Sequence, residues 1–397
     1  MIIFHAQTGT ILLNMLNLKA NQMADEIADI YISNSARIPQ ELIQFTRDSG
    51  LFRNVVIINQ YFGRMSEKYR NSTKLRFIFY IYKAISMLTG QRDYAKILSK
   101  PLYSDKCDVL ITHGLWLSSL YIVNYFYSRN NSLNIYIMDE GIGTMNTSFQ
   151  VLTNPKRDDL FPSRFHKMIY EIIWFITTGH CCNKDISNFR SRVTDYYLHN
   201  PENSRLYRET SLTPHKLLPF DSNNKLTPLL NKLLDEIDYE EYVHRKLWIL
   251  SDYDVLESHP LHLTFMKILE TTLSSFSQNN VILKGHPNLL LNEEYYSSLW
   301  PELYLDNRKY QLEALYSQID LNDKILITRV SSAVFYPKYM FNAEPHVIFT
   351  YKLSPKETDM EAMDRLVNSL KELYENPQKI YVPFTEDELK NIICHIS

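Results

Sequence analysis

The sequence predicts an α/β protein of two domains, each built on a parallel β-sheet covered by helices. At 397 residues the chain is longer than one ordinary hydrophobic core accommodates, so two domains are expected. Short apolar strands alternate with helical segments in both halves, which is typical of parallel sheets. Polar residues directly follow several strands, at the position where ligands bind in open α/β sheets.

The composition excludes several other classes of protein. Apolar residues make up 45% and charged residues 22%, as in soluble globular domains. A net charge of −3 argues against a dedicated nucleic-acid binder, although a local basic cleft for a phosphate remains compatible. The cysteines have neither zinc-site nor disulfide spacing, which fits a reduced cytosolic protein. We expect a cytoplasmic protein, because neither a signal peptide nor a spanning apolar run is found.

The first half of the chain has the alternation of a Rossmann-like domain over residues 1–155. A strand over Ile2–His5 is followed by a loop and by a helix that starts near Ile11. The further strands expected here are Asp29–Ser33, Asn54–Asn59, Asp108–Thr112 and Asn134–Met138, and the further helices are Ser66–Leu98 and Leu115–Ser128. Their nearly continuous apolar character predicts a parallel sheet that is buried on both faces.

Residues 156–243 predict a helical connection and linker. Phe165–Thr178 is apolar and aromatic, which favours a helix packed between domains or in a dimer; the alternative is a membrane-surface helix with basic flanks. Ser211–Lys225 contains Pro214 and Pro219, so it is expected to be a loop and an inter-domain linker.

The alternation restarts in residues 244–397, which predict a second Rossmann-like domain. The expected strands are Lys246–Ser251, a strand from Val281 that ends at the Gly285-His286-Pro287 turn, Leu303–Leu305, Lys324–Thr328 and His346–Tyr351. The expected helices are Leu261–Ser277, Gln311–Ile319, Ser331–Met340 and Glu357–Glu375. Two such domains facing each other across a cleft form the GT-B architecture of nucleotide-sugar glycosyltransferases.

Two carboxylates end the last strand of the first domain, in Asp139-Glu140-Gly141. Because side chains alternate in direction, one of them can face the cleft while the other caps the next element. A carboxylate in a cleft suits a general base that deprotonates a hydroxyl. Capping of the following helix is the competing interpretation.

An imidazole ends a strand of the second domain, at His286. Pro287 biases this histidine towards extended geometry, and its ordinary pKa allows it to donate a hydrogen bond or a proton to a leaving phosphate. A histidine that only bonds a loop carbonyl is the alternative. His259-Pro260 repeats the dipeptide, but it precedes a predicted helix instead of ending an apolar strand.

Two further polar stretches follow strands of the second domain. Ser331 and Ser332 open a predicted helix, where N-capping and phosphate binding are both compatible, with Arg329 nearby. Asp252-Tyr253-Asp254 has the form of a metal-binding triplet, but a solvated turn is the favoured interpretation. We therefore expect no metal.

These three strand ends resemble the signature of bacterial GT-B sialyltransferases and polysialyltransferases, and most closely glycosyltransferase family 52. That signature is an acidic-acidic-Gly motif, then His-Pro, then a Ser/Thr pair. It corresponds here to Asp139-Glu140-Gly141, His286-Pro287 and Ser331-Ser332, in the same order and domains.

The resemblance implies an inverting transfer of sialic acid from CMP-sialic acid to a sugar hydroxyl, without a metal or other cofactor. It implies that Glu140 is the general base, although aspartate is more usual there and Asp139 stays open as an alternative. His286 would interact with the departing CMP phosphate. The residues expected to bind the donor are Gly141, Lys284, Gly285, Pro287, Glu313, Ser331 and Ser332.

The expected partners are the CMP-sialic acid donor and a glycan or glycolipid acceptor, such as lipooligosaccharide or capsule. The enzyme would be cytoplasmic and could associate peripherally with the inner membrane, where glycolipid acceptors are made. Residues 156–243 could serve in a homodimer, as intertwined segments do in some members of the family. Gln7–Thr10 and the region near His113 are expected to face the acceptor.

Two other functions are compatible with the sequence. The first is a GT-B glycosyltransferase that uses another nucleotide-sugar donor, since a fold alone does not set the substrate. The second is a non-catalytic GT-B-like partner in polysaccharide assembly, which the three intact motifs argue against. Binding of CMP or of another nucleotide distinguishes these possibilities.

Overall fold

A computed structural model gives the fold of the chain in two compact units. It describes residues 1–34, 38–59, 107–115, 117–154, 168, 171–172, 175, 181–221, 223–233, 239–251, 261–286, 290–308, 312–354 and 360–396. The first unit comprises Met1–Leu218 and Asn223–Leu229, and the second comprises Pro219–Ser222 and Leu230–Ser397.

The first unit is built on a seven-stranded sheet with the order β3-β2-β1-β4-β5-β6-β7 among the described residues. Every strand pair in it is parallel. Its strands are β1 (Ile2–Ala6), β2 (Ala28–Asn34), β3 (Asn54–Asn59), β4 (Val109–Thr112), β5 (Asn134–Met138), β6 (Val193–Leu198) and β7 (Thr213–Lys216). The predicted strands of this half are confirmed to within a residue or two at each end.

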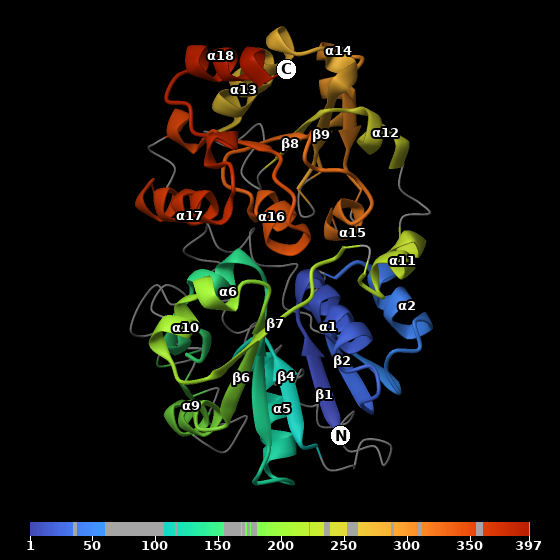
Figure 1. Ribbon diagram of the computed structural model, residues 1–397, viewed down its shortest axis with the longest axis vertical. Helices are drawn as coiled ribbons and strands as arrows, with labels where there is room; N and C mark the ends of the chain where they lie inside the picture. The colour runs from blue at the N-terminus through green and yellow to red at the C-terminus, as the bar shows by residue number, and fades with distance from the viewer. Residues whose placement is uncertain are drawn as a thin grey trace. The chain divides into compact units, whose positions relative to one another are not determined.

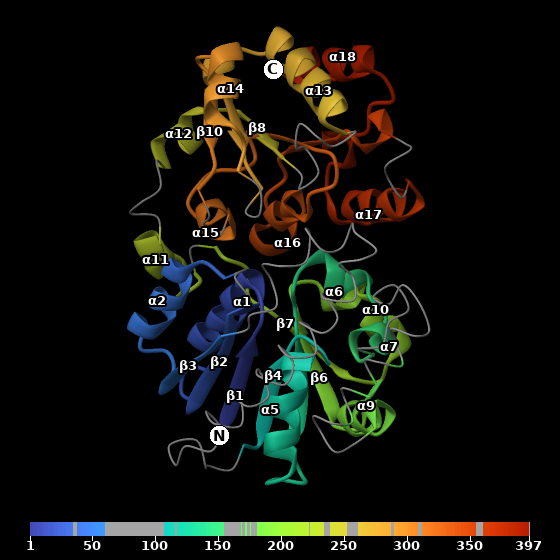
Figure 2. The same cartoon turned by 180° about the vertical axis from the view of Figure 1, so that it is seen from behind.

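Helices cover this sheet, as Figures 1 and 2 show from opposite sides. They are α1 (Gly9–Asn21), α2 (Gln40–Asp48), α5 (Leu117–Tyr127), α6 (Ile142–Asn146), α7 (Phe149–Leu152), α9 (Cys182–Arg190) and α10 (Arg205–Glu209), with a 3₁₀ turn at Pro201–Asn203. Helix α11 (Thr227–Leu230) contains the chain boundary between the two units. Helix α1 begins where the Thr8 hydroxyl accepts a hydrogen bond from the Ile11 N–H, and it packs against β1. Nearly all of its side chains are buried, including Asn14 and Asn17.

Two strands of this sheet come from the region 156–243, for which the sequence predicts a helical connection and linker. The β6 segment pairs with β5, and β7 pairs with β6 as the edge of the sheet. Pro214 lies within β7, where the missing N–H is tolerated because an edge strand needs partners on one side only. The prediction that Ser211–Lys225 is a loop is therefore wrong for Thr213–Lys216.

The second unit is built on a six-stranded parallel sheet with the order β10-β9-β8-β11-β12-β13 in its described part. Its strands are β8 (Leu247–Leu250), β9 (Val281–Lys284), β10 (Tyr304–Asp306), β11 (Ile325–Thr328), β12 (His346–Phe349) and β13 (Ile380–Tyr381). All four residues of β8, β9 and β11 are buried. This burial explains why these strands are apolar without alternation.

The helices of the second unit are α12 (Tyr239–His244), α13 (Leu261–Ser275), α14 (Glu293–Leu299), α15 (Leu312–Tyr316), α16 (Tyr336–Phe341), α17 (Met360–Leu373) and α18 (Glu386–Ile396). In the described part of this unit, 3₁₀ turns lie at Asn231–Leu233, Gln278–Asn280, Ser332–Val334, Tyr351–Leu353 and Pro377–Lys379. Helices α13 and α18 pack side by side (Figures 1 and 2).

The helix predicted over Ser331–Met340 is wrong in its first half. A single 3₁₀ turn, Ser332–Val334, comes first, and α16 begins only at Tyr336. Pro337 lies in the first turn of α16, where a missing N–H is tolerated but an earlier helical turn would clash with the ring.

Several predictions concern residues outside the described part of the chain. They are the helix over Ser66–Leu98, the Asp252-Tyr253-Asp254 triplet, His259-Pro260 and Pro287, together with most of Phe165–Thr178. Among the residues that are described, no helix has both the length and the apolar character needed to cross a membrane.

We expect Ile137→Ala to destabilise the first unit by roughly 2–5 kcal/mol, because it opens a cavity in a central strand. Ile137 in β5 is fully buried, whereas Ile27 is 62% exposed and serves as the control. Ile27→Ala should change the free energy of unfolding by about 0.5 kcal/mol or less. Urea denaturation of both variants measures the difference, and equal losses would contradict the placement of β5 in the core.

Candidate functional site

The strand orders place a switch point in each sheet. From β3 to β6 and from β10 to β13, both sheets follow the order 3-2-1-4-5-6 of a Rossmann fold. The order reverses between β1 and β4 in the first unit and between β8 and β11 in the second. Ligands bind outside the carboxyl ends of the strands at such points. The residues that follow these strands are therefore the candidate site of each unit.

Asp139 is the buried carboxylate at the end of β5. It is fully buried, and its Oδ1 accepts a hydrogen bond from the Gly141 N–H at 2.6 Å. Its Oδ2 accepts one from the His199 N–H at 3.3 Å, and its main-chain oxygen accepts one from Asn14 at 3.1 Å. Asp139 thus ties β5 to the residue after β6 and to α1. These hydrogen bonds satisfy the buried carboxylate of Asp139 and give it a structural role.

Glu140 points the other way and meets a second histidine. Its side chain is 37% exposed, and its Oε2 lies 2.9 Å from Nε2 of His113, whose side chain is only 5% exposed. The Glu140 N–H donates to the Thr144 hydroxyl at 2.9 Å, which fixes the backbone beneath the carboxylate. One carboxylate is thereby held by a buried imidazole while it remains partly accessible to solvent.

The contacts of His113 define where its protons are. Nδ1 lies 3.1 Å from the main-chain oxygen of Met138, which only accepts, so Nδ1 carries a proton. Nε2 faces a carboxylate, so a second proton lies between Nε2 and Glu140. Burial lowers the pKa of His113, but the charge and the hydrogen bond of Glu140 outweigh it, and the pKa is raised overall.

Two other histidines at the same edge behave differently. His5, the last residue but one of β1, bonds Ser33 through Nε2 at 2.8 Å, and burial lowers its pKa to about 3. His199, after β6, bonds the side-chain oxygen of Asn14 at 3.0 Å, and burial with the charge of Lys216 lowers its pKa to about 3. Both are neutral at physiological pH. Among these three, His113 alone faces a carboxylate with an imidazole nitrogen.

Gly141 has a backbone requirement of its own. Its φ of 117° and ψ of −151° belong to a region that residues with a Cβ rarely adopt. This conformation turns the chain from β5 into α6 and brings the Gly141 N–H back to Asp139. The sequence predicts Gly141 as a donor-binding residue; the structure gives it a clear role in the turn.

In the second unit, Ser251 fixes the end of β9. The His286 N–H donates to the Ser251 hydroxyl at 2.9 Å, and the Ser251 N–H donates to the main-chain oxygen of Lys284 at 3.0 Å. Ser251 is buried directly after β8, and His286 is half-buried. Ser251 ends a predicted strand, but no role was predicted for it. The same strand-end rule that selects His286 would have selected it.

Lys284 and Asp306 connect β9 to β10. The Lys284 ammonium lies 2.7 Å from the main-chain oxygen of Arg308, 3.3 Å from that of Gly285 and 3.5 Å from that of Asp306. The Gly285 N–H donates to the main-chain oxygen of Asp306 at 2.8 Å. Burial lowers the pKa of Lys284 to about 8, although the charge of Asp306 opposes this.

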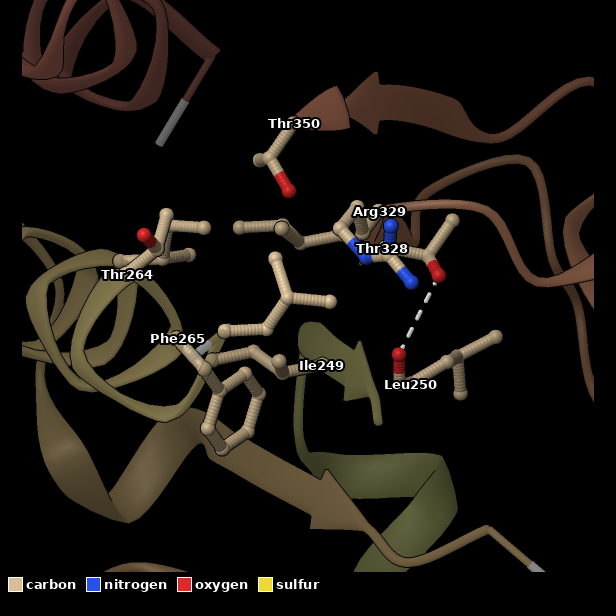
Figure 3. A pocket seen from close by; sticks show the side chains of 10 residues that line it. Ile249, Leu250, Thr264, Phe265, Thr328, Arg329 and Thr350 are labelled. Atoms are coloured by element: carbon tan, nitrogen blue, oxygen red, sulfur yellow. Dashed lines mark hydrogen bonds between the residues drawn. The ribbon is translucent and has the colours of Figure 1, made fainter. Parts of the chain in front are cut away.

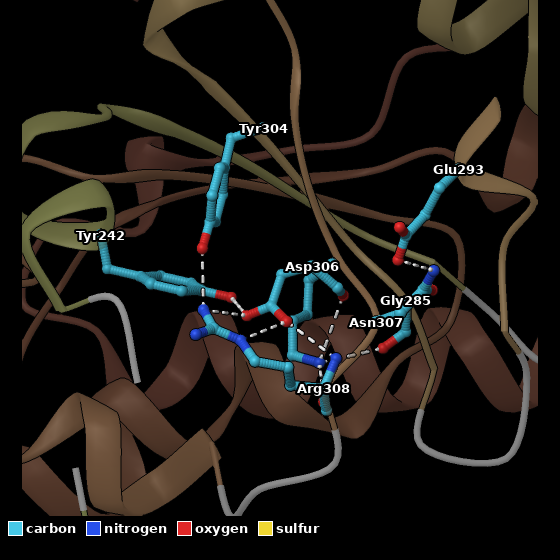
Figure 4. Close-up of polar contacts among 8 residues, drawn as sticks. Tyr242, Gly285, Glu293, Tyr304, Asp306, Asn307 and Arg308 are labelled. Atoms are coloured by element: carbon cyan, nitrogen blue, oxygen red, sulfur yellow. Dashed lines mark hydrogen bonds and ion pairs between the residues drawn. The ribbon is translucent and has the colours of Figure 1, made fainter. Parts of the chain in front are cut away.

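Asp306 is the centre of a hydrogen-bond network that Figure 4 shows. Its Oδ2 accepts from the Tyr242 hydroxyl at 2.5 Å, and its Oδ1 accepts from Nε of Arg308 at 3.1 Å and from the Arg308 N–H at 2.8 Å. Arg308 also donates to the Tyr304 hydroxyl at 2.8 Å. This network orders the segment that follows β10. Sequence reasoning missed it, although an aspartate directly after an apolar strand is a visible signal.

The serine pair lies after β11. The Ser331 hydroxyl accepts from the Ala333 N–H at 3.3 Å, so Ser331 caps the 3₁₀ turn; its own N–H donates to the Thr328 hydroxyl at 3.0 Å. Ser332 is exposed. Capping is therefore observed for Ser331. A single 3₁₀ turn followed by a six-residue helix lacks the long dipole that the predicted anion site relied on.

A small cavity marks the switch point of the second sheet (Figure 3). It lies between β8, β11 and α13, and the side chains around it include Thr264, Thr328, Arg329 and Thr350. Its volume of about 20 Å³ holds about one water molecule. The cavity therefore lies at the switch point of the second sheet, but it is too small to hold a nucleotide.

The remaining predicted site residue in the described part is Glu313. It is buried in the first turn of α15. No group of three or more His, Cys, Asp or Glu side chains suited to a metal occurs within the described ranges.

Comparison with known proteins identifies the fold. No protein-family model matches the sequence, and no curated protein matches it. Among solved structures, Arabidopsis thaliana UGT89C1 complexed with UDP-L-rhamnose is similar with a TM-score of 0.52 at 10% identity, covering 99% of this chain and 88% of that one. A putative UDP-N-acetylglucosamine 2-epimerase from Listeria monocytogenes has a TM-score of 0.50 at 8% identity, covering 100% and 87%. Another UDP-N-acetylglucosamine 2-epimerase has a TM-score of 0.50 at 10% identity, covering 98% and 85%.

These similarities show that the chain has a GT-B fold of two parallel-sheet α/β domains, which confirms the predicted fold class. At such low identity they show the fold alone.

We expect the pKa of His113 to fall below its ordinary value of 6.5 in Glu140→Gln, because burial then acts without the carboxylate. In the wild type the raised pKa means that the pair stabilises the fold below pH 6.5 and loses this contribution as the pH rises through the folded-state pKa. NMR titration of the His113 imidazole measures both proteins. An unchanged pKa in Glu140→Gln would contradict the assigned contact, and His199 is the internal control.

Proposed function

We propose that this protein is a glycosyltransferase that uses a nucleotide-sugar donor, with Glu140 as the general base. The observation that carries the proposal is the Glu140–His113 contact of 2.9 Å at the carboxyl edge of a GT-B domain. The fold supports it as well, because a similar structure holds UDP-L-rhamnose and two others are named as UDP-N-acetylglucosamine 2-epimerases.

The proposed reaction is a single displacement. The Glu140 carboxylate takes the proton from an acceptor hydroxyl, and the acceptor oxygen attacks the anomeric carbon of the donor sugar. The bond from that carbon to the nucleotide phosphate breaks as the new bond forms, so the configuration inverts. His286 stabilises the charge that develops on the departing phosphate. His113 keeps the Glu140 carboxylate ionised and oriented.

The choice between Asp139 and Glu140 follows from their partners. Both carboxylate oxygens of Asp139 accept backbone hydrogen bonds, and the residue is fully buried. Glu140 is 37% exposed, and its carboxylate contacts His113. A base must reach the hydroxyl that it deprotonates, so Glu140 is the residue that fits this role.

For the donor we propose CMP-sialic acid first and another nucleotide sugar second. The Asp139-Glu140-Gly141, His286-Pro287 and Ser331-Ser332 pattern supports CMP-sialic acid, with a glycan or glycolipid acceptor. The similar structures support a UDP-linked sugar, since their names carry UDP-sugars. The GT-B fold is compatible with either donor.

The experiment that tests the proposal is nucleotide release from a panel of CMP-, UDP-, GDP- and CDP-linked sugars, with and without sugar acceptors and with EDTA present. We expect acceptor-dependent release from one donor that survives EDTA. Release that EDTA abolishes would assign a metal to Asp252 and Asp254. Conversion of UDP-N-acetylglucosamine to its 2-epimer, or no turnover and no nucleotide binding, would overturn the proposal.

We expect Glu140→Gln to lower kcat by roughly 10²- to 10⁴-fold with little change in donor affinity, because a general base acts in the transition state. Asp139→Asn should instead lower the free energy of unfolding by about 1–3 kcal/mol, because one buried acceptor is replaced by a donor. Steady-state kinetics and urea denaturation of both variants separate the two roles. A larger loss of kcat from Asp139→Asn, in a protein that remains folded, would exchange the assignments.

A further inference from the structure

We propose that Lys284 is a positioning residue that holds His286 in place by tying the end of β9 to the segment after β10. This inference rests on the proposed function, in which His286 assists departure of the nucleotide. It also assigns Lys284 a different role from the donor contact that the sequence predicts.

The ammonium of Lys284 lies among three main-chain oxygens. Those of Arg308, Gly285 and Asp306 are 2.7, 3.3 and 3.5 Å away. An ammonium has three N–H donors and no acceptor, so it can direct one N–H to each oxygen. Lys284 is only 6% exposed. Its charge is therefore used to join two strand ends inside the protein.

Two further hydrogen bonds hold the end of β9, one to the end of β10 and one to the side chain of the residue that follows β8. The Gly285 N–H donates to Asp306 at 2.8 Å, and the His286 N–H donates to the Ser251 hydroxyl at 2.9 Å. With Lys284 these contacts fix both peptide groups of Gly285. His286 is the next residue, so its backbone position depends on this arrangement.

The segment that Lys284 binds is itself ordered by charge. Asp306 accepts hydrogen bonds from Tyr242 and Arg308, and Arg308 donates to Tyr304 (Figure 4). Asn307 bonds Leu291 through both its N–H group, at 2.8 Å, and its oxygen, at 2.9 Å. The charges that face Lys284 are thus Asp306, which favours the ammonium, and Arg308, which opposes it. Lys284 anchors β9 to a rigid segment.

The turnover of the enzyme should depend on whether Lys284 is protonated. Burial lowers the pKa of Lys284 to about 8 from its ordinary 10.5, with Asp306 opposing the shift and Arg308 adding to it. Above pH 8 the neutral amine has two N–H donors and a lone pair that faces an oxygen, so one hydrogen bond is lost. Between pH 8 and 10.5 the unfolded chain binds this proton more tightly, so this titration itself does not destabilise the fold. We therefore attribute a loss of turnover between pH 8 and 10.5 to displacement of His286.

Lys324 provides a matched control in the same unit. It is also 6% exposed, and its ammonium lies 2.7 Å from the main-chain oxygen of Val243 and 3.0 Å from that of Arg245. Burial lowers its pKa too. It precedes β11, however, and so lies at the amino end of the sheet, opposite to His286. Loss of either ammonium leaves backbone oxygens unpaired.

The experiment compares Lys284→Met and Lys324→Met in the full chain. We expect Lys284→Met to lower kcat by about 10- to 100-fold, as expected for a misplaced catalytic group, and Lys324→Met by about threefold or less. The kcat of the wild type should fall as the pH rises through about 8, and the kcat of Lys284→Met should not show this fall. In the His286→Ala background, Lys284→Met should cause little further loss. Equal losses of kcat from the two lysine variants, or additive losses from Lys284→Met and His286→Ala, would overturn the proposal.

Hydrogen exchange followed by mass spectrometry or NMR separates this inference from the proposed function. In Lys284→Met we expect faster exchange at the N–H groups of Gly285, His286 and Arg308, whereas Lys324→Met should leave these three unchanged. Unchanged exchange in Lys284→Met would overturn the proposed positioning role of Lys284, whatever the catalytic activity. Faster exchange in Lys284→Met, together with a wild type that transfers no sugar from any donor, would support the positioning role and overturn the proposed function.

Discussion

The structure depends on one constraint at its strand ends: a charge buried there requires hydrogen-bond partners inside the protein. Asp139 meets this requirement with the N–H groups of Gly141 and His199, and Asp306 meets it with Tyr242 and Arg308. Lys284 meets it with main-chain oxygens. The contacts of Asp139 with His199 and of Lys284 with Arg308 join the ends of neighbouring strands, and Tyr242 joins Asp306 to α12. The buried charges therefore order the loops that carry the candidate site.

In both units the more accessible candidate residue follows soon after such a buried charge. Glu140 follows Asp139, and His286 follows Lys284 by two positions. Alternation along extended backbone turns Asp139 inwards and Glu140 towards solvent. This arrangement gives rigidity to the partly exposed side chain without burying it. It also explains why adjacent polar residues, which look equivalent in the sequence, have different tasks.

Much of the fold could be predicted, and the failures have physical causes. Buried strands such as Leu247–Leu250 are apolar without interruption, so the sequence shows them clearly. Strand β7 was missed because Pro214 lies in it, and a proline is tolerated only at the edge of a sheet, which a sequence does not reveal. The helix after Ser331 was overestimated because Pro337 interrupts it. Asp139, Glu140 and His286 could be predicted as candidate site residues because a polar residue after an apolar strand is visible in the sequence.

The amino-acid sequence was enough to predict the α/β class, the GT-B fold and the strand ends that carry polar residues, because apolar periodicity and its interruptions are local properties. Which of those residues are anchors and which are accessible depends on contacts that form only in the folded protein. His113 and Glu140 are 27 positions apart in number, and Lys284 and Arg308 are 24 apart. Parallel pairing of β4 with β5 and of β9 with β10 brings each pair together. Strand pairing therefore decides which partner a charged group meets. The partner in turn decides the burial, the protonation and the role of that group.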